Sequence, residues 1–311
     1  MDNLCVDITS WRVIHASPTK GSRDKKWVVK PVQMEKDETE LFLFKESHKR
    51  HPAEFWSEII THRIGELVGV PTPETHCTKF ENTYAALIKF FLKIKDGKII
   101  EDLVHGGDLI LGKHPDFDRK KGETHNVFFV EEILRGQLKH LGLYEKFLSI
   151  LVFDALIGNT DRHQDNWGII AEVGGQKPSF RLAPAFDNSD SLGRELMEEK
   201  LDGFLKEDGV QLQRYLEKGL PHLRWSVDGR SLEWINHFEL LKRLSEKWPS
   251  VADNVKAQTS FANEAIDRIL DPLAETKVDN PKYQLSPKRL QLMKRIICMR
   301  RDMLKETFKL L

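Results

Sequence analysis

The chain has 311 residues, a length that favours two domains or one domain with a distinct lobe. Its 48 Lys and Arg residues balance 48 Asp and Glu residues, and this zero net charge argues against a protein that mainly coats nucleic acid or an anionic membrane. The apolar content of 40% is ordinary for a globular protein and excludes intrinsic disorder, collagen and small disulfide scaffolds.

The apolar pattern predicts neither a signal peptide nor a membrane span. The most apolar windows, residues 85–91 and 149–157, are far shorter than the ~18 residues that a membrane span needs. The N-terminus carries acidic residues where a signal peptide is basic. The three cysteines, Cys5, Cys77 and Cys298, are far apart in sequence, so we expect reduced thiols in a cytoplasmic protein.

Apolar runs that end at turn residues predict a strand-rich region over residues 1–95. Five short strands are expected there, at residues 11–14, 26–31, 41–45, 72–79 and 84–91. The first two flank a polar tip, residues 17–25, and therefore indicate a hairpin. Between the third and fourth strands, residues 52–68 have apolar side chains at helical spacing and are followed by Gly69, which predicts one helix.

From about residue 126 the pattern becomes mainly helical. Residues 145–156 form a strongly apolar run that stops at Gly158, which predicts a buried helix. Two short strands are expected next, at residues 166–170 and 179–182, joined by Gly174 and Gly175. The last predicted helix, residues 287–311, has one apolar face and a basic opposite face.

These elements together predict an α+β, bilobal fold. Residues 1–95 form its small, sheet-rich lobe, and residues 96–311 form its larger helical lobe. We expect a cleft between the two lobes.

A run of polar residues, from Gly158 to Trp167, directly follows the apolar helix. Because ordered elements flank it, its side chains are held in one geometry. The run contains Asp161 and, five residues later, Asn166, while Asp187 follows the second of the two strands. This is the pattern of phosphoryl transfer from a nucleotide: the first Asp accepts the hydroxyl proton of the substrate, and the Asn and second Asp hold Mg²⁺.

Phosphoryl transfer also needs a cation for the phosphates of the nucleotide and a carboxylate that orients this cation. Lys45 ends the third predicted strand, and Glu58 lies thirteen residues further on, inside the predicted helix. Glu54, about one helical turn earlier, is the alternative carboxylate, and we favour Glu58. Gly21, in the polar tip, is a weak signal for a loop that follows the phosphates.

The string from Leu156 to Gly168 resembles the catalytic loop of HipA-like serine/threonine kinases, particularly the compact, CtkA-like members. The segment from Leu182 to Asn188 is similar to the metal-binding turn of this family. The resemblance implies a protein-kinase-like fold, shared with phosphoinositide kinases, and the use of ATP and Mg²⁺. It also implies a bacterial cytoplasmic protein, with export as an effector left open.

The resemblance assigns a role to each residue of the expected site. Asp161 is the catalytic base, and Asn166 and Asp187 bind the metal. Arg162 and His163 support the loop, although the residue type of Arg162 suits phosphate binding equally well. The expected ATP-binding residues are Lys45, Glu58, Gly21, Ser22, Lys89 and Phe90. Family members phosphorylate a serine of the loop over the nucleotide, for which the candidates here are Ser17, Thr19 and Ser22.

The implied substrate is a Ser or Thr hydroxyl of a protein, either an aminoacyl-tRNA synthetase or a host protein. An antitoxin partner is left open, and we expect no direct contact with nucleic acid. Two alternatives remain from the residues themselves. One is a phosphoinositide-type lipid kinase that uses the same loop, and the other is a nucleotide-binding pseudokinase that acts as an interaction module.

Overall fold

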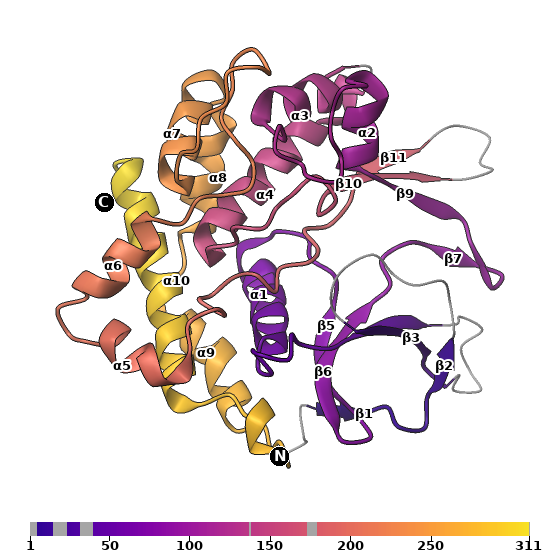
Figure 1. Cartoon of the computed structure of the whole chain (residues 1–311), viewed down its shortest axis with the longest axis vertical. Coiled ribbons are helices and arrows are strands. Elements are labelled where there is room, and N and C mark those ends of the chain that lie inside the picture. The colour runs from indigo at the N-terminus through magenta and orange to yellow at the C-terminus, as the bar shows by residue number, and fades with distance from the viewer. Residues whose placement is uncertain (1–4, 15–23, 32–39, 137, 173–178, 311) are drawn as a thin grey trace.

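The computed structural model describes residues 5–14, 24–31, 40–136, 138–172 and 179–310. The chain forms a sheet-rich lobe and a helical lobe, as Figure 1 shows, which confirms the expected α+β, bilobal architecture. Several predicted features lie outside the described residues, namely Ser17, Thr19, Gly21, Ser22 and the turn at Gly174 and Gly175.

A six-stranded sheet forms most of the first lobe, in the order β1-β5-β6-β4-β3-β2. Its strands are β1 (Cys5–Asp7), β2 (Arg12–Ile14), β3 (Lys25–Val29), β4 (Leu41–Lys45), β5 (Thr75–Phe80) and β6 (Thr83–Lys89). β1 and β5 are parallel, and the other neighbours are antiparallel. Phe42 and Phe44 of β4 are buried in one apolar cluster of this lobe. Because side chains alternate along a strand, Leu43 and Lys45 extend from the opposite face.

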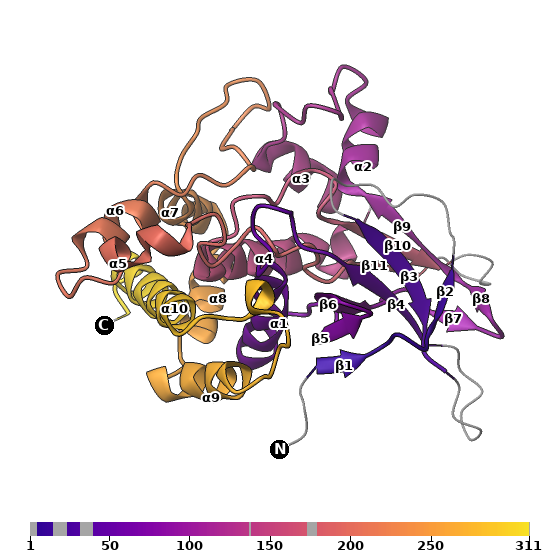
Figure 2. The same ribbon diagram turned by 60° about the horizontal axis from the view of Figure 1, so that its bottom comes forward.

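Helix α1 (Phe55–Val68) follows β4 and lies between this sheet and helices α9 and α10 in both views (Figures 1 and 2). Its apolar side chains Trp56, Ile60 and Ile64 are completely buried. The helix ends at Gly69, whose φ of 73° is in the left-handed region that glycine adopts without a steric penalty. The predicted helix is confirmed, with a start three residues later than expected.

A second sheet, in the order β11-β10-β9, connects the two lobes. It consists of β9 (Glu101–His105), β10 (Gly168–Glu172) and β11 (Phe180–Leu182), and a small hairpin precedes it, formed by β7 (Ile94–Lys95) and β8 (Lys98–Ile99). The sequence predicted β10 and β11 but not β9. The polar run that ends at Trp167 leads into β10, and Asp187 follows β11, so this sheet determines how far apart the two turns lie.

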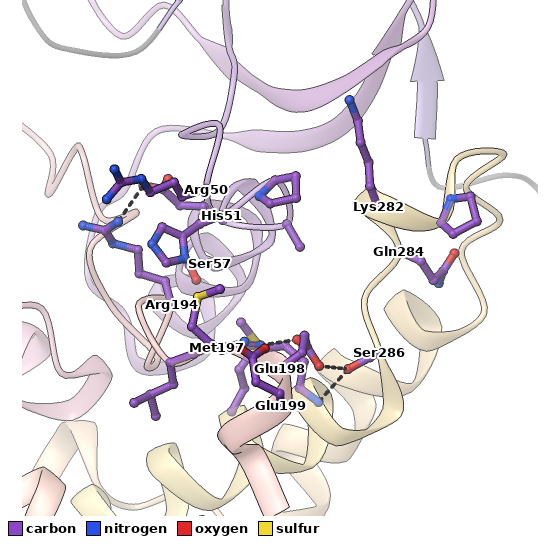
Figure 3. A pocket seen from close by; sticks show the side chains of 17 residues that line it. Arg50, His51, Ser57, Arg194, Met197, Glu198, Glu199, Lys282, Gln284 and Ser286 are labelled. Atoms are coloured by element: carbon purple, nitrogen blue, oxygen red, sulfur yellow. Dashed lines mark hydrogen bonds and ion pairs between the residues drawn. The ribbon is translucent and has the colours of Figure 1, made fainter.

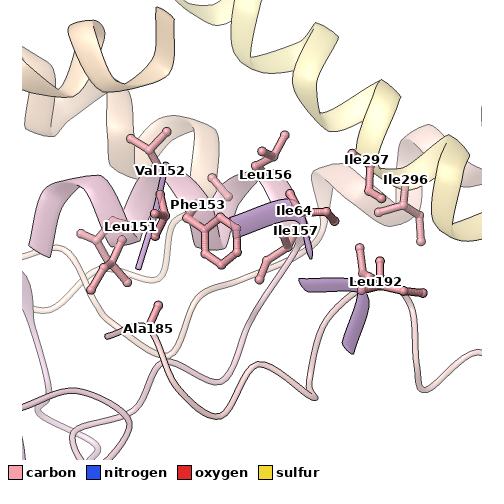
Figure 4. Packing of buried hydrophobic residues seen from close by; sticks show 14 of the residues in the cluster. Ile64, Leu151, Val152, Phe153, Leu156, Ile157, Ala185, Leu192, Ile296 and Ile297 are labelled. Carbon is pink, nitrogen blue, oxygen red and sulfur yellow. The ribbon is translucent and has the colours of Figure 1, made fainter. Parts of the chain in front are cut away.

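The second lobe is mainly helical. Its helices are α2 (Gly106–Lys113), α3 (Val127–Leu134), α4 (Leu143–Ile157), α5 (Leu201–Phe204), α6 (Val210–Glu217), α7 (His237–Lys247), α8 (Ser250–Gln258), α9 (Asn263–Ala274) and α10 (Pro287–Thr307). Most of α4 is buried, and Figure 4 shows its apolar side chains next to Ile296 and Ile297 of α10. None of the described helices has the length and apolar character of a membrane-spanning segment.

The last helix differs from its prediction in one respect. Met293, Ile296, Ile297 and Leu304 are buried as expected. However, Arg289, Arg300 and Arg301 are also more than nine-tenths buried, so the basic side chains of this helix do not all face solvent. Their guanidinium groups donate hydrogen bonds to backbone carbonyls of neighbouring segments.

The cysteines also differ from their prediction. Cys5 and Cys77 form a disulfide bond, whereas we expected three reduced thiols. The two residues are directly opposite each other in the pairing of β1 with β5. Their separation of 72 residues along the chain concealed this proximity, because strand pairing is not visible in cysteine spacing. Cys298 is a free thiol.

Trp167 anchors the end of the polar run to the helical lobe. It is 2% exposed, its backbone carbonyl accepts a hydrogen bond from the Gly106 N–H at 2.8 Å, and its indole N–H donates to His125 Nε2 at 3.1 Å. The indole ring lies directly against the backbone of Gly106, with no space for a β-carbon there.

We expect Gly106→Ala to destabilise the protein by about 1–3 kcal/mol, the typical cost of overpacking a well-packed site. Gly112→Ala is the matched control in the same helix, because nothing lies within 4 Å of its β-carbon position. This second change should be neutral or stabilise by up to about 1 kcal/mol. Urea denaturation of both variants measures the difference, and equal stability would contradict the close contact.

Two neighbouring histidines are held neutral by the fold, His125 beside Trp167 and His222 beside His125. Burial lowers the pKa of His125 well below its usual value, and the neighbouring His222 and His163 add to the effect. Burial likewise lowers the pKa of His222 to about 4, with further contributions from His163 and Arg224. The unfolded chain therefore binds more protons than the folded chain between about pH 4 and pH 6.5.

The expected result is a melting temperature that falls as the pH decreases from 6.5 towards 4, since protonation of these histidines favours the unfolded chain. His222→Gln should give a shallower dependence on pH than the parent protein. His140→Gln, at an exposed position, serves as the control and should leave the dependence unchanged. Differential scanning calorimetry at several pH values provides the measurement, and identical profiles for all three proteins would refute the explanation.

Candidate active site

A cavity of about 360 Å³ lies where the two lobes meet. Polar side chains from both lobes line it, namely Lys25, Lys45, Glu58, His105, His163, Asp165, Asn166 and Asp187. Apolar side chains form the remaining walls, namely Leu43, Pro73, Ile88, Phe91 and Phe186. Convergent charged groups beside an apolar wall are the usual features of a small-molecule site.

Lys45 is the centre of the charged groups in this cavity. It is the last residue of β4 and is 5% exposed. Its ammonium group lies 2.6 Å from a carboxylate oxygen of Asp187 and 3.3 Å from one of Glu58. Burial raises the pKa of Glu58 above its ordinary value; Lys45 opposes this rise, and the nearby Asp187 carboxylate adds to it. The structure therefore brings Lys45 to Glu58, while Glu54 contacts the His48 N–H and Arg194 instead.

Asp187 occupies a turn with an unusual backbone. Its φ of 56° is in the left-handed region, which costs a residue other than glycine roughly 1–2 kcal/mol. The next residue helps to hold this turn, because the Asn188 N–H donates a hydrogen bond to Glu58 at 3.3 Å. Strained turns of this kind persist when the surroundings over-determine them, and they cluster at functional sites.

Arg162 does not line the cavity, and its side chain instead joins the turns around it. It is 1% exposed and forms a bidentate ion pair with Asp154 of α4, at 2.6 and 2.9 Å. The same guanidinium group donates to the carbonyls of Asn166 and Phe186 and to the side-chain oxygen of Asn188. All of these contacts are to groups of α4 and of the surrounding turns, and the sequence did not identify either Asp154 or Asn188.

The polar run also has an internal network of hydrogen bonds. The Asp161 N–H donates to Asn159 Oδ1 at 2.9 Å, and Asn166 Nδ2 donates to the Asp161 carbonyl at 2.8 Å. His163 Nδ1 accepts from the Asp165 N–H at 3.1 Å. Asn166 and His163 line the cavity, whereas Asp161 lies next to them in the chain and does not belong to the lining.

The donor groups of Asn166 and Asp187 fit a magnesium ion. Because Asn166 Nδ2 donates to a backbone carbonyl, the amide oxygen Oδ1 is the atom that remains as a ligand. Asp187 contributes a carboxylate whose side chain is 31% exposed. Mg²⁺ prefers oxygen ligands and is usually bound by one or two carboxylates, with phosphates and water completing its octahedron. Two protein oxygens at this place therefore suffice.

Some of the expected ATP-binding residues are not in this cavity. Lys89 pairs with Glu40 at 3.0 Å and with Glu74 at 3.3 Å, and it lines a different hollow together with Phe90. Their neighbours Ile88 and Phe91 line the cavity instead. Gly21 and Ser22 lie outside the described residues. The sequence did not indicate Ile88 or Phe91 as site residues, and the ATP-binding role of Lys89 and Phe90 stays a prediction.

A second cavity, of about 340 Å³, lies beside the start of α1 (Figure 3). Figure 3 shows Arg50, His51 and Arg194 near one another, and Glu198 beside Ser286. Glu198 accepts hydrogen bonds from Ser286 and Arg289. Of the residues considered for catalysis or for ATP or metal binding, its described lining includes Glu54, the alternative to Glu58, and no other.

Comparisons with known proteins identify the family and the fold of this chain. The model of the HipA-like C-terminal domain matches residues 6–276. The proinflammatory kinase CtkA of Helicobacter pylori is similar in structure, with a TM-score of 0.70, 17% identity and coverage of 97% of this chain and 94% of that one. HipA of the Shewanella oneidensis toxin–antitoxin system, solved with HipB and operator DNA, has a TM-score of 0.57 and 13% identity.

The match to HipA covers 87% of this chain and 60% of that one. No curated protein sequence matches this chain significantly. The two structures share its fold, which confirms the expected protein-kinase-like architecture. Since the family model matches well over half of the chain, the protein belongs to the family with a HipA-like C-terminal domain.

Proposed function

We propose that the protein is an ATP- and Mg²⁺-dependent kinase that phosphorylates a Ser or Thr hydroxyl of a protein. The observation that carries this proposal is the contact of Lys45 with both Glu58 and Asp187 in a cavity that Asn166 also lines. The fold of kinases in the same family supports it. In this proposal residues 1–95 bind the nucleotide from one side, and residues 96–311 supply the catalytic and metal-binding turns.

When bound, ATP supplies the phosphoryl group, and Mg²⁺ supplies the positive charge that neutralises its negative charge during transfer. Lys45 would orient the phosphates through its ammonium group, which Glu58 contacts at 3.3 Å. Leu43, Ile88 and Phe91 provide an apolar wall for the base. Asn166 and Asp187 offer their oxygen atoms to the metal.

Asp161 accepts the proton of the substrate hydroxyl in this mechanism. Its backbone is fixed by hydrogen bonds from the Asn166 side chain and to the Asn159 side chain. Arg162 keeps the Asp161 turn and the Asp187 turn at a constant separation. Most of the rate enhancement in such a site comes from positioning and from charge stabilisation.

The identity of the protein substrate is a separate part of the proposal. An aminoacyl-tRNA synthetase, a host protein and an antitoxin partner are suggested by family resemblance alone. Incubation with labelled ATP and either a protein extract or phosphoinositide vesicles distinguishes a protein kinase from a lipid kinase. Nucleotide binding without transfer to any acceptor would favour a pseudokinase.

We expect Asp161→Asn and Asp187→Asn each to lower the turnover number by a factor of about 10² or more. The first change removes the general base, which contributes about 10²–10⁴. The second removes the carboxylate proposed to hold the metal ion that stabilises the charge of the transferred group. Asp271→Asn, at an exposed position of α9, is the matched control. Phosphate transfer is measured with labelled ATP after circular dichroism has shown that the variants are folded. Transfer at the parental rate by either variant would exclude the proposed role of that residue.

The same proteins test autophosphorylation, which we include in the proposal. Intact-mass and peptide analysis should find phosphate on Ser17, Thr19 or Ser22 of the parent protein and none on Asp161→Asn. An unmodified loop in both proteins would exclude autophosphorylation there, while leaving the kinase proposal to the transfer assay.

The role of Glu58 is tested against Glu54, which is also buried and lies one helical turn earlier. Glu58→Gln removes the negative charge that holds Lys45 and should lower kcat/KM for ATP about tenfold, equivalent to ~1.4 kcal/mol. Glu54→Gln should change it less than about threefold. Steady-state kinetics provides the measurement, and equal losses in both variants would show that the contact with Lys45 is not the cause.

A further inference from the structure

A third cavity, of about 320 Å³, lies in the helical lobe beside the polar run. Gly158 and Thr160 of that run line it, and Thr160 directly precedes Asp161. Residues 192, 193 and 195, which follow the Asp187 turn, line another side. A group bound in this cavity would therefore lie next to both turns of the candidate active site.

Arg300 of α10 lines this cavity and is 2% exposed. Its Nε donates to the Ala155 carbonyl, and its Nη1 donates to the Leu216 carbonyl at 3.3 Å. The buried Nη2 has no hydrogen-bond partner among the described residues. The ring of Phe238, with its centroid 5.1 Å from the guanidinium carbon, gives the cation partial compensation.

The comparison with Arg162 shows what Arg300 lacks. Both guanidinium groups are buried in the same lobe, and Arg162 has a carboxylate partner in Asp154. For Arg300 no ion pair with an acidic side chain is found in the described part of the chain, and burial lowers its pKa to about 10. An uncompensated buried charge is costly, whereas an anion that pairs with it offsets this cost.

The other lining residues suit a side chain with an anionic end. Ile157, Leu192 and Ile296 provide an apolar wall, and Figure 4 shows them near one another. Lys218 lies at the exposed rim and adds a second positive charge. The acidic Glu195 is also at the rim, where its carboxylate accepts a hydrogen bond from the Tyr215 hydroxyl at 2.6 Å.

We infer that this cavity binds an anionic side chain of the protein substrate, a carboxylate or a phosphorylated residue, at a fixed distance from the acceptor hydroxyl. This inference rests on the proposed function and specifies its substrate class. The position favours a substrate side chain, because the cavity adjoins the residue before the proposed base. Arg300 and Lys218 are specificity residues in this arrangement and take no part in the chemical step.

The first experiment uses Ser-containing peptides in which Glu, Gln or phosphoserine occupies one position at a time. An anionic residue at one fixed distance from the acceptor should raise kcat/KM at least tenfold over Gln, mainly through a lower KM. Comparison of Glu with phosphoserine shows which anion is preferred. Equal kcat/KM values for the Glu, phosphoserine and Gln peptides at every position would overturn the inference.

The second experiment compares variants of the two basic residues on the preferred anionic peptide and its Gln counterpart. Arg300→Gln should reduce the preference at least fivefold. Lys218→Glu, at an exposed position, should reduce it at least threefold. Lys277→Glu, exposed and outside the lining of this cavity, is the charge-matched control and should behave as the parent protein.

Retention of the full preference by Lys218→Glu and by every folded Arg300 variant would overturn the inference. If Arg300→Gln does not fold, Lys218→Glu decides the matter alone.

A binding assay without ATP separates this inference from the proposed function. Fluorescent peptides with Ala in place of Ser should bind the parent protein at least fivefold more tightly with the anionic residue than with Gln, and Lys218→Glu should reduce this difference at least threefold. Failure of phosphate transfer with this difference intact would refute the proposed function and support the cavity as an anion site. Equal binding of both peptides by the parent protein would refute the cavity, whatever the transfer assay gives.

Discussion

The candidate site depends on one buried cation, the guanidinium group of Arg162. A guanidinium removed from water needs partners for its donors, and here these partners come from three separate parts of the chain. Asp154 belongs to the buried helix α4, Asn166 to the polar run, and Phe186 and Asn188 to the turn after β11. If either turn moved, the buried Arg162 guanidinium group would lose hydrogen-bond acceptors that this turn provides. The two turns therefore behave as one rigid unit.

The sheet-rich lobe is attached to this unit through a second set of charges. Lys45 reaches Asp187 from β4, and Glu58 reaches both Lys45 and the Asn188 N–H from α1. The cavity thus forms only where β4, α1 and the rigid unit meet. Arg300 is equally buried in the same lobe but has no carboxylate partner among the described residues, and this difference from Arg162 is the basis of the anion site proposed above.

Local patterns were enough to predict much of this arrangement. Apolar spacing identified α1, and the need of phosphoryl transfer for a cation singled out Lys45 at the end of a predicted strand. Pairings between distant segments were not visible: β9, the Cys5–Cys77 bond and the partners of Arg162 depend on which strands and turns become neighbours. One local signal did exist, because Asp154 is an acid inside an otherwise apolar run, where a buried ion pair is the common reason for a charge.

The alternation of side chains along β4 has a consequence for how the protein can change in evolution. Phe44 belongs to the core of the first lobe and Lys45 to the cavity, although they are adjacent in the chain. The pairing of β4 with β3 and β6 fixes Phe44 on the core side of the sheet and Lys45 on the cavity side. A single-residue insertion or deletion within β4 would exchange these faces and bury the ammonium group in hydrocarbon. We therefore expect insertions and deletions in the loops that connect the strands, and only substitutions within β4.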